Sequence, residues 1–265
     1  MHIESHGDGP SIALVHGWAM HGGLFMPLVE RLRGHYTLHL VDLPGHGRSH
    51  DSDMPLDPAA LAPVLVDAVP DAVWLGWSLG GQFALRAALD QPARVRGLVM
   101  LASSPRFVVA DDWPHGVKPT LFRDFGDALS RDFRGTLDGF LALEALGSAS
   151  AQTELRDLRA RAFERGEPAP AALLRGLELL DAFDARNELP QLRVPSLWIS
   201  GRRDRLVPAG AMPAAAELAP DATSLVIRDA SHVPFLGAAD EVAQAIDDFA
   251  TRAFAHGHDM TMQLR

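Results

Sequence analysis

The pentapeptide Gly76-Trp77-Ser78-Leu79-Gly80 has the spacing of a sharp turn that presents a nucleophilic serine. Glycines two positions on either side of Ser78 avoid clashes between crowded β-carbons. An apolar run precedes the pentapeptide and a helical pattern follows it, as this turn requires. An ordinary glycine-rich turn is the alternative interpretation. Because a serine hydroxyl is a weak nucleophile without a base, a histidine and an orienting acid are expected elsewhere.

The candidate base and acid follow two later apolar runs. Asp204 comes after residues 194–200, and His232 comes after residues 223–227. Ligand sites of open α/β sheets lie where the strands end, so we expect Ser78, Asp204 and His232 to lie together. In a triad of this kind the histidine takes the serine proton and the acid orients the histidine.

Other residues of the same types are alternatives. Asp229 is expected in the turn that leads to His232, and Asp184 in the helical segment before residue 190. His16 is expected to brace its loop by hydrogen bonding, not to act as the base. The motif His256-Gly257-His258 has a spacing that could bind a metal, but a lone motif in a terminal tail rarely does. We therefore expect no metal and no cofactor.

A reacting ester also needs donors for the oxyanion that develops on its carbonyl oxygen. The backbone N–H of Leu79 should supply one, because the helix that follows directs its first N–H groups to this point. The second should come from the loop His16-Gly17-Trp18, with the N–H of Trp18 as the best candidate. Trp18 could equally be a packing residue.

Short apolar runs alternate with helical patterns, which is typical of a mainly parallel sheet with crossover helices. The predicted strands are 12–15, 37–42, 72–76, 95–102, 194–200 and 223–227. Helices are predicted after Asp57-Pro58 and over 79–89, 209–218 and 239–254. Between about 105 and 190 only helices are predicted, over 120–129, 133–146, 152–164 and 171–183. We expect an α/β core of residues 1–104 and 191–256, a helical cap of residues 105–190 and a flexible tail over 257–265.

The composition excludes several classes of protein. The chain of 265 residues contains no cysteine, which excludes disulfides and thiolate metal sites. Its 34 acidic and 24 basic residues give a net charge of −10, which disfavours a nucleic-acid partner. No apolar run approaches the ~20 residues of a membrane span, and the N-terminus lacks the features of a secretory signal. We expect a monomeric cytoplasmic protein.

Together these residues resemble the α/β-hydrolase superfamily across essentially the whole chain. Further motifs resemble the BioH family, the carboxylesterases of biotin synthesis. They are Leu14-Val15-His16-Gly17-Trp18, Asp42-Leu43-Pro44-Gly45-His46-Gly47-Arg48-Ser49, Gly76-Trp77-Ser78-Leu79-Gly80-Gly81, Ala102-Ser103-Ser104-Pro105, Asp112-Trp113-Pro114, Lys118-Pro119 and Phe140-Leu141-Ala142-Leu143.

This resemblance implies hydrolysis of the methyl ester of pimeloyl-acyl carrier protein to pimeloyl-acyl carrier protein and methanol. The positions of the family's substrate site match Trp18, Trp77, Leu79, Phe107 and Phe140. The alternatives are a broad-specificity short-chain carboxylesterase without a carrier partner and a non-hydrolytic binding protein.

The resemblance also implies that arginines of the cap receive the carrier protein. Arg156 matches through the Phe-Leu-Ala-Leu motif and Arg159 lies one turn later, whereas Gly135, Gly139 and Gln152 replace arginines common in the family. Helical spacing predicts no acid along the face of Arg156 and Arg159. It predicts ion pairs within another face, formed by Asp127, Arg131, Arg134 and Asp138.

Overall fold

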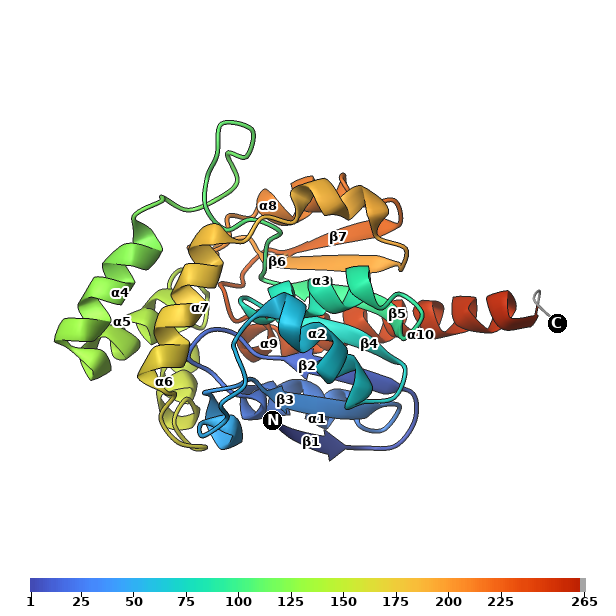
Figure 1. Ribbon diagram of the computed structural model, residues 1–265, viewed down its shortest axis with the longest axis horizontal. Coiled ribbons are helices and arrows are strands. Elements are labelled where there is room, and N and C mark those ends of the chain that lie inside the picture. Colours follow the sequence, from blue (N-terminus) through green and yellow to red (C-terminus); the bar gives the residue numbers. More distant parts are fainter. Residues whose placement is uncertain (263–265) are drawn as a thin grey trace.

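A seven-stranded sheet forms the core of the computed structural model, which describes the backbone of residues 1–262 and the side chains of residues 1–255 (Figure 1). The strand order is β1-β3-β2-β4-β5-β6-β7, and only the β1–β3 pair is antiparallel. The strands are β1 (His2–His6), β2 (Ser11–Val15), β3 (Thr37–Asp42), β4 (Ala72–Trp77), β5 (Val95–Leu101), β6 (Ser196–Gly201) and β7 (Ala222–Ile227). The predicted α/β fold is confirmed.

Strand β1 was not predicted from the sequence. Ile3 is its only aliphatic residue, between polar neighbours, and most of its side chains are half-buried. It lies at the edge of the sheet and pairs with β3 alone. Because an edge strand has solvent on one side, it does not need the apolar run that marks a buried strand.

Helices cover both faces of the sheet (Figure 1). One face carries α1 (Met26–Leu32) and α10 (Ala239–Met262), which pack on each other, and the other carries α2 (Pro58–Asp67), α3 (Gly80–Asp90) and α8 (Ala211–Ala216). Asp57 caps α2 by accepting from the N–H groups of Ala59 and Ala60, as its place before Pro58 suggests. Helix α10 continues past the predicted end at Phe254, and residues 263–265 of the predicted tail lie outside the described residues.

Four helices inserted between β5 and β6 gather at one end of the sheet (Figure 1). They are α4 (Leu121–Arg131), α5 (Phe133–Ala145), α6 (Ala151–Arg161) and α7 (Pro170–Ala182), and we call them the cap. The indole N–H of Trp18 donates to the carbonyl of Leu173 at 2.8 Å, and the amide of Gln82 donates to Leu179 at 3.3 Å. These bonds attach α7 to the loop after β2 and to α3.

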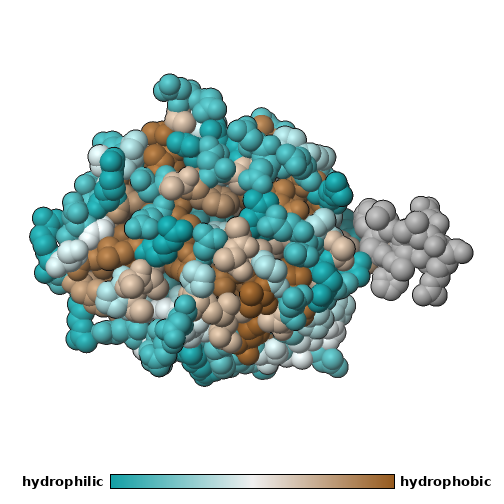
Figure 2. Space-filling view, in the orientation of Figure 1, coloured by the Kyte–Doolittle hydropathy of each residue, from teal (hydrophilic) through white to brown (hydrophobic). Residues whose placement is uncertain are grey.

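Shorter helices complete the chain: η1 (Gly22–Phe25), η2 (Gly47–Ser49), η3 (Arg186–Gln191) and α9 (Pro234–Gly237). Figure 2 shows hydrophilic residues over much of the visible surface, with smaller groups of apolar residues between them. Among the described helices, none combines the length and the apolar character needed to span a bilayer.

Candidate active site

Ser78 occupies the turn between β4 and α3. Its backbone has a φ of +54°, a conformation that side chains rarely adopt. Two hydrogen bonds hold it there: the Ser78 N–H donates to Leu101 at 3.0 Å, and the Ser103 hydroxyl donates to the Ser78 carbonyl at 2.7 Å. A β-carbon on Gly76 would lie 2.4 Å from the carbonyl oxygen of Gly80, so the turn requires glycine at this position.

The structure brings Ser78, His232 and Asp204 together as predicted. The hydroxyl of Ser78 lies 2.8 Å from Nε2 of His232, and Nδ1 of His232 lies 2.8 Å from Oδ2 of Asp204. Since an ionised carboxylate can only accept, Nδ1 donates to Asp204 and Nε2 is left to accept from the serine. The other oxygen of Asp204 accepts from the N–H groups of Leu206 and Val207 at 2.7 and 2.9 Å. All three side chains are buried.

The alternative acids occupy other places. Asp229 pairs with Arg203 at 2.8 Å. Asp184 pairs with Arg106 and Arg186. Only Asp204 of the three candidates hydrogen-bonds His232 within the described chain.

The backbone around Ser78 also suits an oxyanion site. A β-carbon on Gly17 would lie 3.1 Å from the β-carbon of Ser78, so the loop that carries Trp18 packs directly on the serine. Leu79 begins the turn into α3. No hydrogen bond among the described residues occupies the backbone N–H of Trp18 or Leu79. Both groups therefore remain able to donate to a reacting carbonyl.

Aromatic side chains from the cap meet Trp18. Its ring lies 4.6 Å from the ring of Phe140 and 6.4 Å from that of Phe125, and Phe107 packs against Phe122. Phe122 and Phe125 belong to α4 and were not selected from the sequence, although their spacing of three residues would place both on one helical face.

Trp77 takes a different place among the predicted substrate-site residues. Its ring packs on Phe25 and Phe235, and its indole N–H donates to the carbonyl of His232 at 2.9 Å. In this position Trp77 fixes the backbone of His232 through its indole N–H. Its place in an acyl channel stays a prediction.

The cap contributes a buried acid next to the triad. The carbonyl of Glu144, at the end of α5, accepts from the N–H of His232 at 3.1 Å. The Glu144 carboxyl is fully buried, and neither of its oxygens has a hydrogen-bond partner among the described residues. Burial, and then the charge of Asp204, raise the pKa of Glu144 well above its usual range, which favours the neutral acid. Its position directly after the Phe-Leu-Ala-Leu segment was the only sequence signal.

A second cap acid, Glu154 of α6, connects the cap to the loop of His232. One of its oxygens accepts from the hydroxyl of Ser231 at 3.1 Å, and the other accepts from the hydroxyls of Ser148 and Ser150. Nearby, the N–H of Ala149 donates to the carbonyl of Asp229 at 3.1 Å. The turn between α5 and α6 is thus bonded to the residues that precede His232 in the chain.

The motif that begins at Asp42 holds the segment that follows Trp18 in the chain. The buried carboxylate of Asp42 accepts from the N–H groups of Gly22 and Arg48 at 2.7 and 2.9 Å. The guanidinium of Arg165, which follows α6, lies 3.4 Å from the same carboxylate and also pairs with Glu4. Arg165 therefore joins a second side of the cap to the core.

His16 and His46 form a buried pair beside this loop, with ring centroids 5.2 Å apart. His16 braces the loop as expected: Nδ1 donates to the Gly17 carbonyl at 2.8 Å, and Nε2 accepts from the Leu43 N–H at 3.0 Å. Burial is the main cause that lowers the pKa of His16 to about 3 and that of His46 to about 4. Both rings are therefore neutral at physiological pH.

The ion-pair partners of the cap arginines differ from those that helical spacing predicts. Arg159 donates to both carboxylate oxygens of Asp138 at 2.6 Å, and Arg134 pairs with Glu167. The predicted pairing within the 127–138 face is wrong for Arg134 and Asp138, because neighbouring segments of the cap supply closer partners than the same helix does. Arg156 has an acid beside it after all, Asp157 at 3.3 Å.

Comparisons with known proteins identify the family. The model of the α/β-hydrolase fold family matches residues 10–239. The chain belongs to this family. It is 58% identical over 249 residues to a pimeloyl-[acyl-carrier protein] methyl ester esterase of Xanthomonas oryzae pv. oryzae, a match that covers 94% of this chain and 98% of the relative. A protein of the same name from Stenotrophomonas maltophilia is 56% identical over 94% of this chain and 96% of its own length.

Solved structures agree on the fold. An esterase from Exiguobacterium antarcticum superposes with a TM-score of 0.81 at 21% identity, covering 94% of each chain. An enol-lactonase from Burkholderia xenovorans gives a TM-score of 0.80 at 21% identity, over 94% of this chain and 96% of its own. At these identities the likeness concerns the fold alone.

The metal motif considered in the sequence lies outside the described side chains, because those of His256 and His258 are not among them. Among the described residues, no group of three or more His, Asp or Glu side chains is arranged to hold a metal ion.

The buried histidines predict a pH dependence of stability. Between pH 6.5 and about 4 the unfolded chain binds protons at His16 and His46 that the folded chain excludes. The free energy of unfolding should therefore fall as the pH is lowered through this window, and the full stability is present above it. Replacing His46 by Asn should reduce the slope between pH 5 and 6 by about 1.4 kcal/mol per pH unit.

Urea unfolding followed by circular dichroism at several pH values measures this slope. His35→Asn is the matched control, because the His35 side chain is 72% exposed. Equal slopes in His46→Asn and in the wild type would contradict the role given to the buried ring.

Proposed function

We propose that the protein is a serine carboxylesterase of biotin synthesis. Its substrate is the methyl ester of pimeloyl-acyl carrier protein, and its products are pimeloyl-acyl carrier protein and methanol. The observation that supports this most is the 56–58% identity, over 94% of the chain, to relatives that bear this enzyme's name. A cytoplasmic monomer is part of the proposal, and the lack of cysteine suits such a reducing compartment.

The hydrogen bonds of His232 suggest how the ester is cleaved. His232 Nε2 accepts the proton of Ser78 while the serine oxygen attacks the ester carbonyl. Asp204 keeps the Nδ1 proton in place and stabilises the imidazolium. The N–H groups of Trp18 and Leu79 donate to the oxyanion.

Collapse of this tetrahedral intermediate breaks the bond to the methoxy group. His232 returns the proton to the departing oxygen, and methanol leaves. Water then attacks the acyl-serine with His232 again accepting the proton, which frees the pimeloyl carboxylate and restores Ser78.

The rest of the proposed site serves recognition. Trp18, Phe107 and Phe140 bury an apolar acyl chain, together with Leu79 and Trp77. Arg156 and Arg159 contact the carrier protein from the cap. Their existing ion pairs with Asp157 and Asp138 limit the free charge that each can offer.

The substrate proposal is tested with two esters of the same acyl group. The purified protein should hydrolyse the pimeloyl methyl ester on acyl carrier protein with a much lower KM than dimethyl pimelate. The carrier supplies contacts that the free ester lacks, and methanol release measures both rates. Equal kcat/KM for both esters, or a preference for short esters such as p-nitrophenyl acetate, would indicate a broad-specificity carboxylesterase.

Replacing Ser78 by Ala should lower kcat for any ester by at least about 10³-fold, because the attacking oxygen is lost. The fold should be retained, since alanine meets the same backbone strain as serine at this φ. Hydrolysis of p-nitrophenyl acetate and the thermal unfolding midpoint are the two measurements. A variant that keeps more than a few per cent of the wild-type rate would remove Ser78 from the mechanism.

Replacing Asp204 by Asn should lower kcat by up to about 10⁴-fold, because the amide can stabilise the wrong imidazole tautomer. Asp229→Asn is the matched control: it changes the neighbouring loop and its ion pair with Arg203 without touching His232. We expect Asp229→Asn to stay within a few-fold of the wild type. The opposite order of effects would transfer the orienting role to Asp229.

A further inference from the structure

Four exposed arginines lie on the two loops that carry the candidate acid and base. Arg202, Arg203 and Arg205 follow β6, and Arg228 follows β7. We call them the core-loop arginines. None was predicted from the sequence as a docking residue.

Strand pairing places these arginines in one region. Gly201 at the end of β6 is in register with Ile227 at the end of β7, so Arg202 and Arg228 follow neighbouring strand ends. The N–H of Arg202 donates to the carbonyl of Ile227 at 2.9 Å, and the N–H of Arg203 donates to Ala230 at 3.0 Å. The two turns therefore lie side by side at the carboxyl edge of the sheet, the edge of the sheet at which the cap lies (Figure 1).

Most of the positive charge of this cluster is free. Arg203 pairs with Asp229 and also donates to the carbonyl of Gly147 in the cap at 3.1 Å. Arg202, Arg205 and Arg228 form no ion pair with any residue in the described part of the chain. The cluster thus adjoins the cap through Arg203 and presents the other three guanidinium groups to solvent.

The cap differs from this cluster in net charge. Arg134, Arg156 and Arg159 each have a carboxylate partner, whereas Arg123, Arg131 and Arg161 form no ion pair with the described residues. Residues 121–161 hold six arginines but also seven acidic residues, so the positive charge of the cap is offset by neighbouring carboxylates. The two core loops hold four arginines against Asp204 and Asp229.

The charge of the whole molecule makes this difference important. The protein has a net charge of −10, so its average field repels an acidic partner. A local positive surface is needed to attract such a partner and to set its orientation. The core-loop arginines are such a surface, next to the candidate triad.

We infer that the core-loop arginines form the main docking surface for an acidic acyl carrier protein, with the cap arginines in a smaller role. This inference rests on the proposed function. The carrier's acidic face lies over the ends of β6 and β7 and reaches the cap at the corner that Arg203 contacts.

The test uses Arg202→Gln/Arg228→Gln in the full-length enzyme. Arg203 and Arg205 are left unchanged because they flank Asp204. We expect KM for the carrier-bound pimeloyl methyl ester to rise about tenfold at low salt. Because salt screens exposed charges, the difference from the wild type should shrink at about 0.5 M NaCl. Turnover of p-nitrophenyl acetate, which has no carrier, reports whether the candidate triad is intact and should stay near the wild type.

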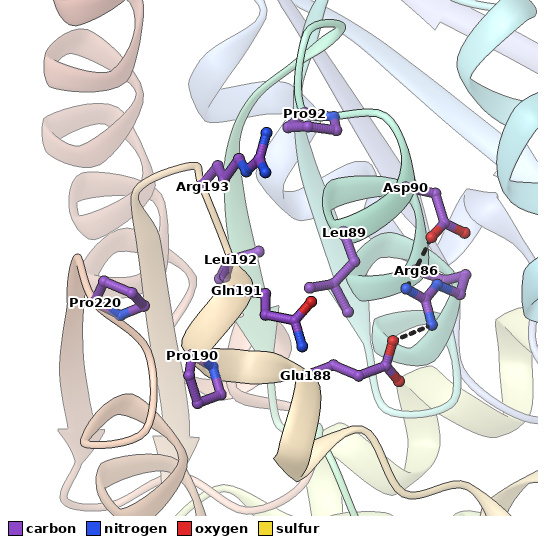
Figure 3. Close-up of a pocket in the computed structure, with 10 residues that line it drawn as sticks. All are labelled: Arg86, Leu89, Asp90, Pro92, Glu188, Pro190, Gln191, Leu192, Arg193 and Pro220. Carbon is purple, nitrogen blue, oxygen red and sulfur yellow. Dashed lines mark hydrogen bonds and ion pairs between the residues drawn. The ribbon is translucent and has the colours of Figure 1, made fainter.

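Two further variants serve as controls. Arg202→Lys/Arg228→Lys keeps the charge and should restore most of the affinity. Arg193→Gln removes an exposed arginine that precedes β6 at the opposite edge of the sheet, and it should leave KM unchanged. Figure 3 shows Arg193 beside a surface pocket in which Arg86 is held by Asp90 and Glu188, whereas Arg193 has no ion pair within the described chain.

The outcomes separate this inference from the proposed function. If the wild type hydrolyses the carrier-bound ester and only Arg156→Glu/Arg159→Glu raises KM, the docking surface is on the cap and the inference is overturned. Equal losses on both substrates, or an equal effect of Arg193→Gln, would overturn it as well. If the wild type does not act on the carrier-bound ester, the proposed function itself fails.

Discussion

The position of one buried histidine constrains most of the structure. Both ring nitrogens of His232 are hydrogen-bonded, to Ser78 and Asp204. Its backbone N–H donates to Glu144 of the cap, and its carbonyl accepts from the indole of Trp77. These four bonds come from three parts of the chain, the end of β4 with the serine turn, the loop after β6 and the cap, so the placement of the imidazole depends on the assembly of all three.

The parallel sheet makes this assembly possible. Ser78 follows β4, Asp204 follows β6 and His232 follows β7, and parallel strands bring these three ends to one edge. The serine turn adds a strained backbone that is held by Ser103 and Leu101. Such strain persists only where surrounding contacts enforce it, and here it aims the hydroxyl at the histidine.

The hydrogen-bonded arrangement of Ser78, His232 and Asp204 could be predicted because these residues follow strands that are visible as apolar runs, and because the order Ser, Asp, His matches the fold. Strand β1 could not, since a half-exposed edge strand has no such run. The contacts of Glu144, Glu154 and Arg165 also escaped prediction. They depend on how the cap sits on the core, which local periodicity does not determine. For the same reason helical spacing assigned the wrong partner to Asp138, whose true partner Arg159 lies on the next helix.

The bonds of Glu154 have a thermodynamic consequence. This carboxylate holds two serines of the cap and also Ser231, the neighbour of His232. A change that stabilises the cap in its docked position also stabilises His232 in its hydrogen-bonded position. By reciprocity, a change that stabilises this position of His232 also stabilises the docked cap. A ligand that binds the docked cap more tightly than a displaced cap would therefore raise the fraction of molecules in which Ser78, His232 and Asp204 are hydrogen-bonded, without touching any of their atoms.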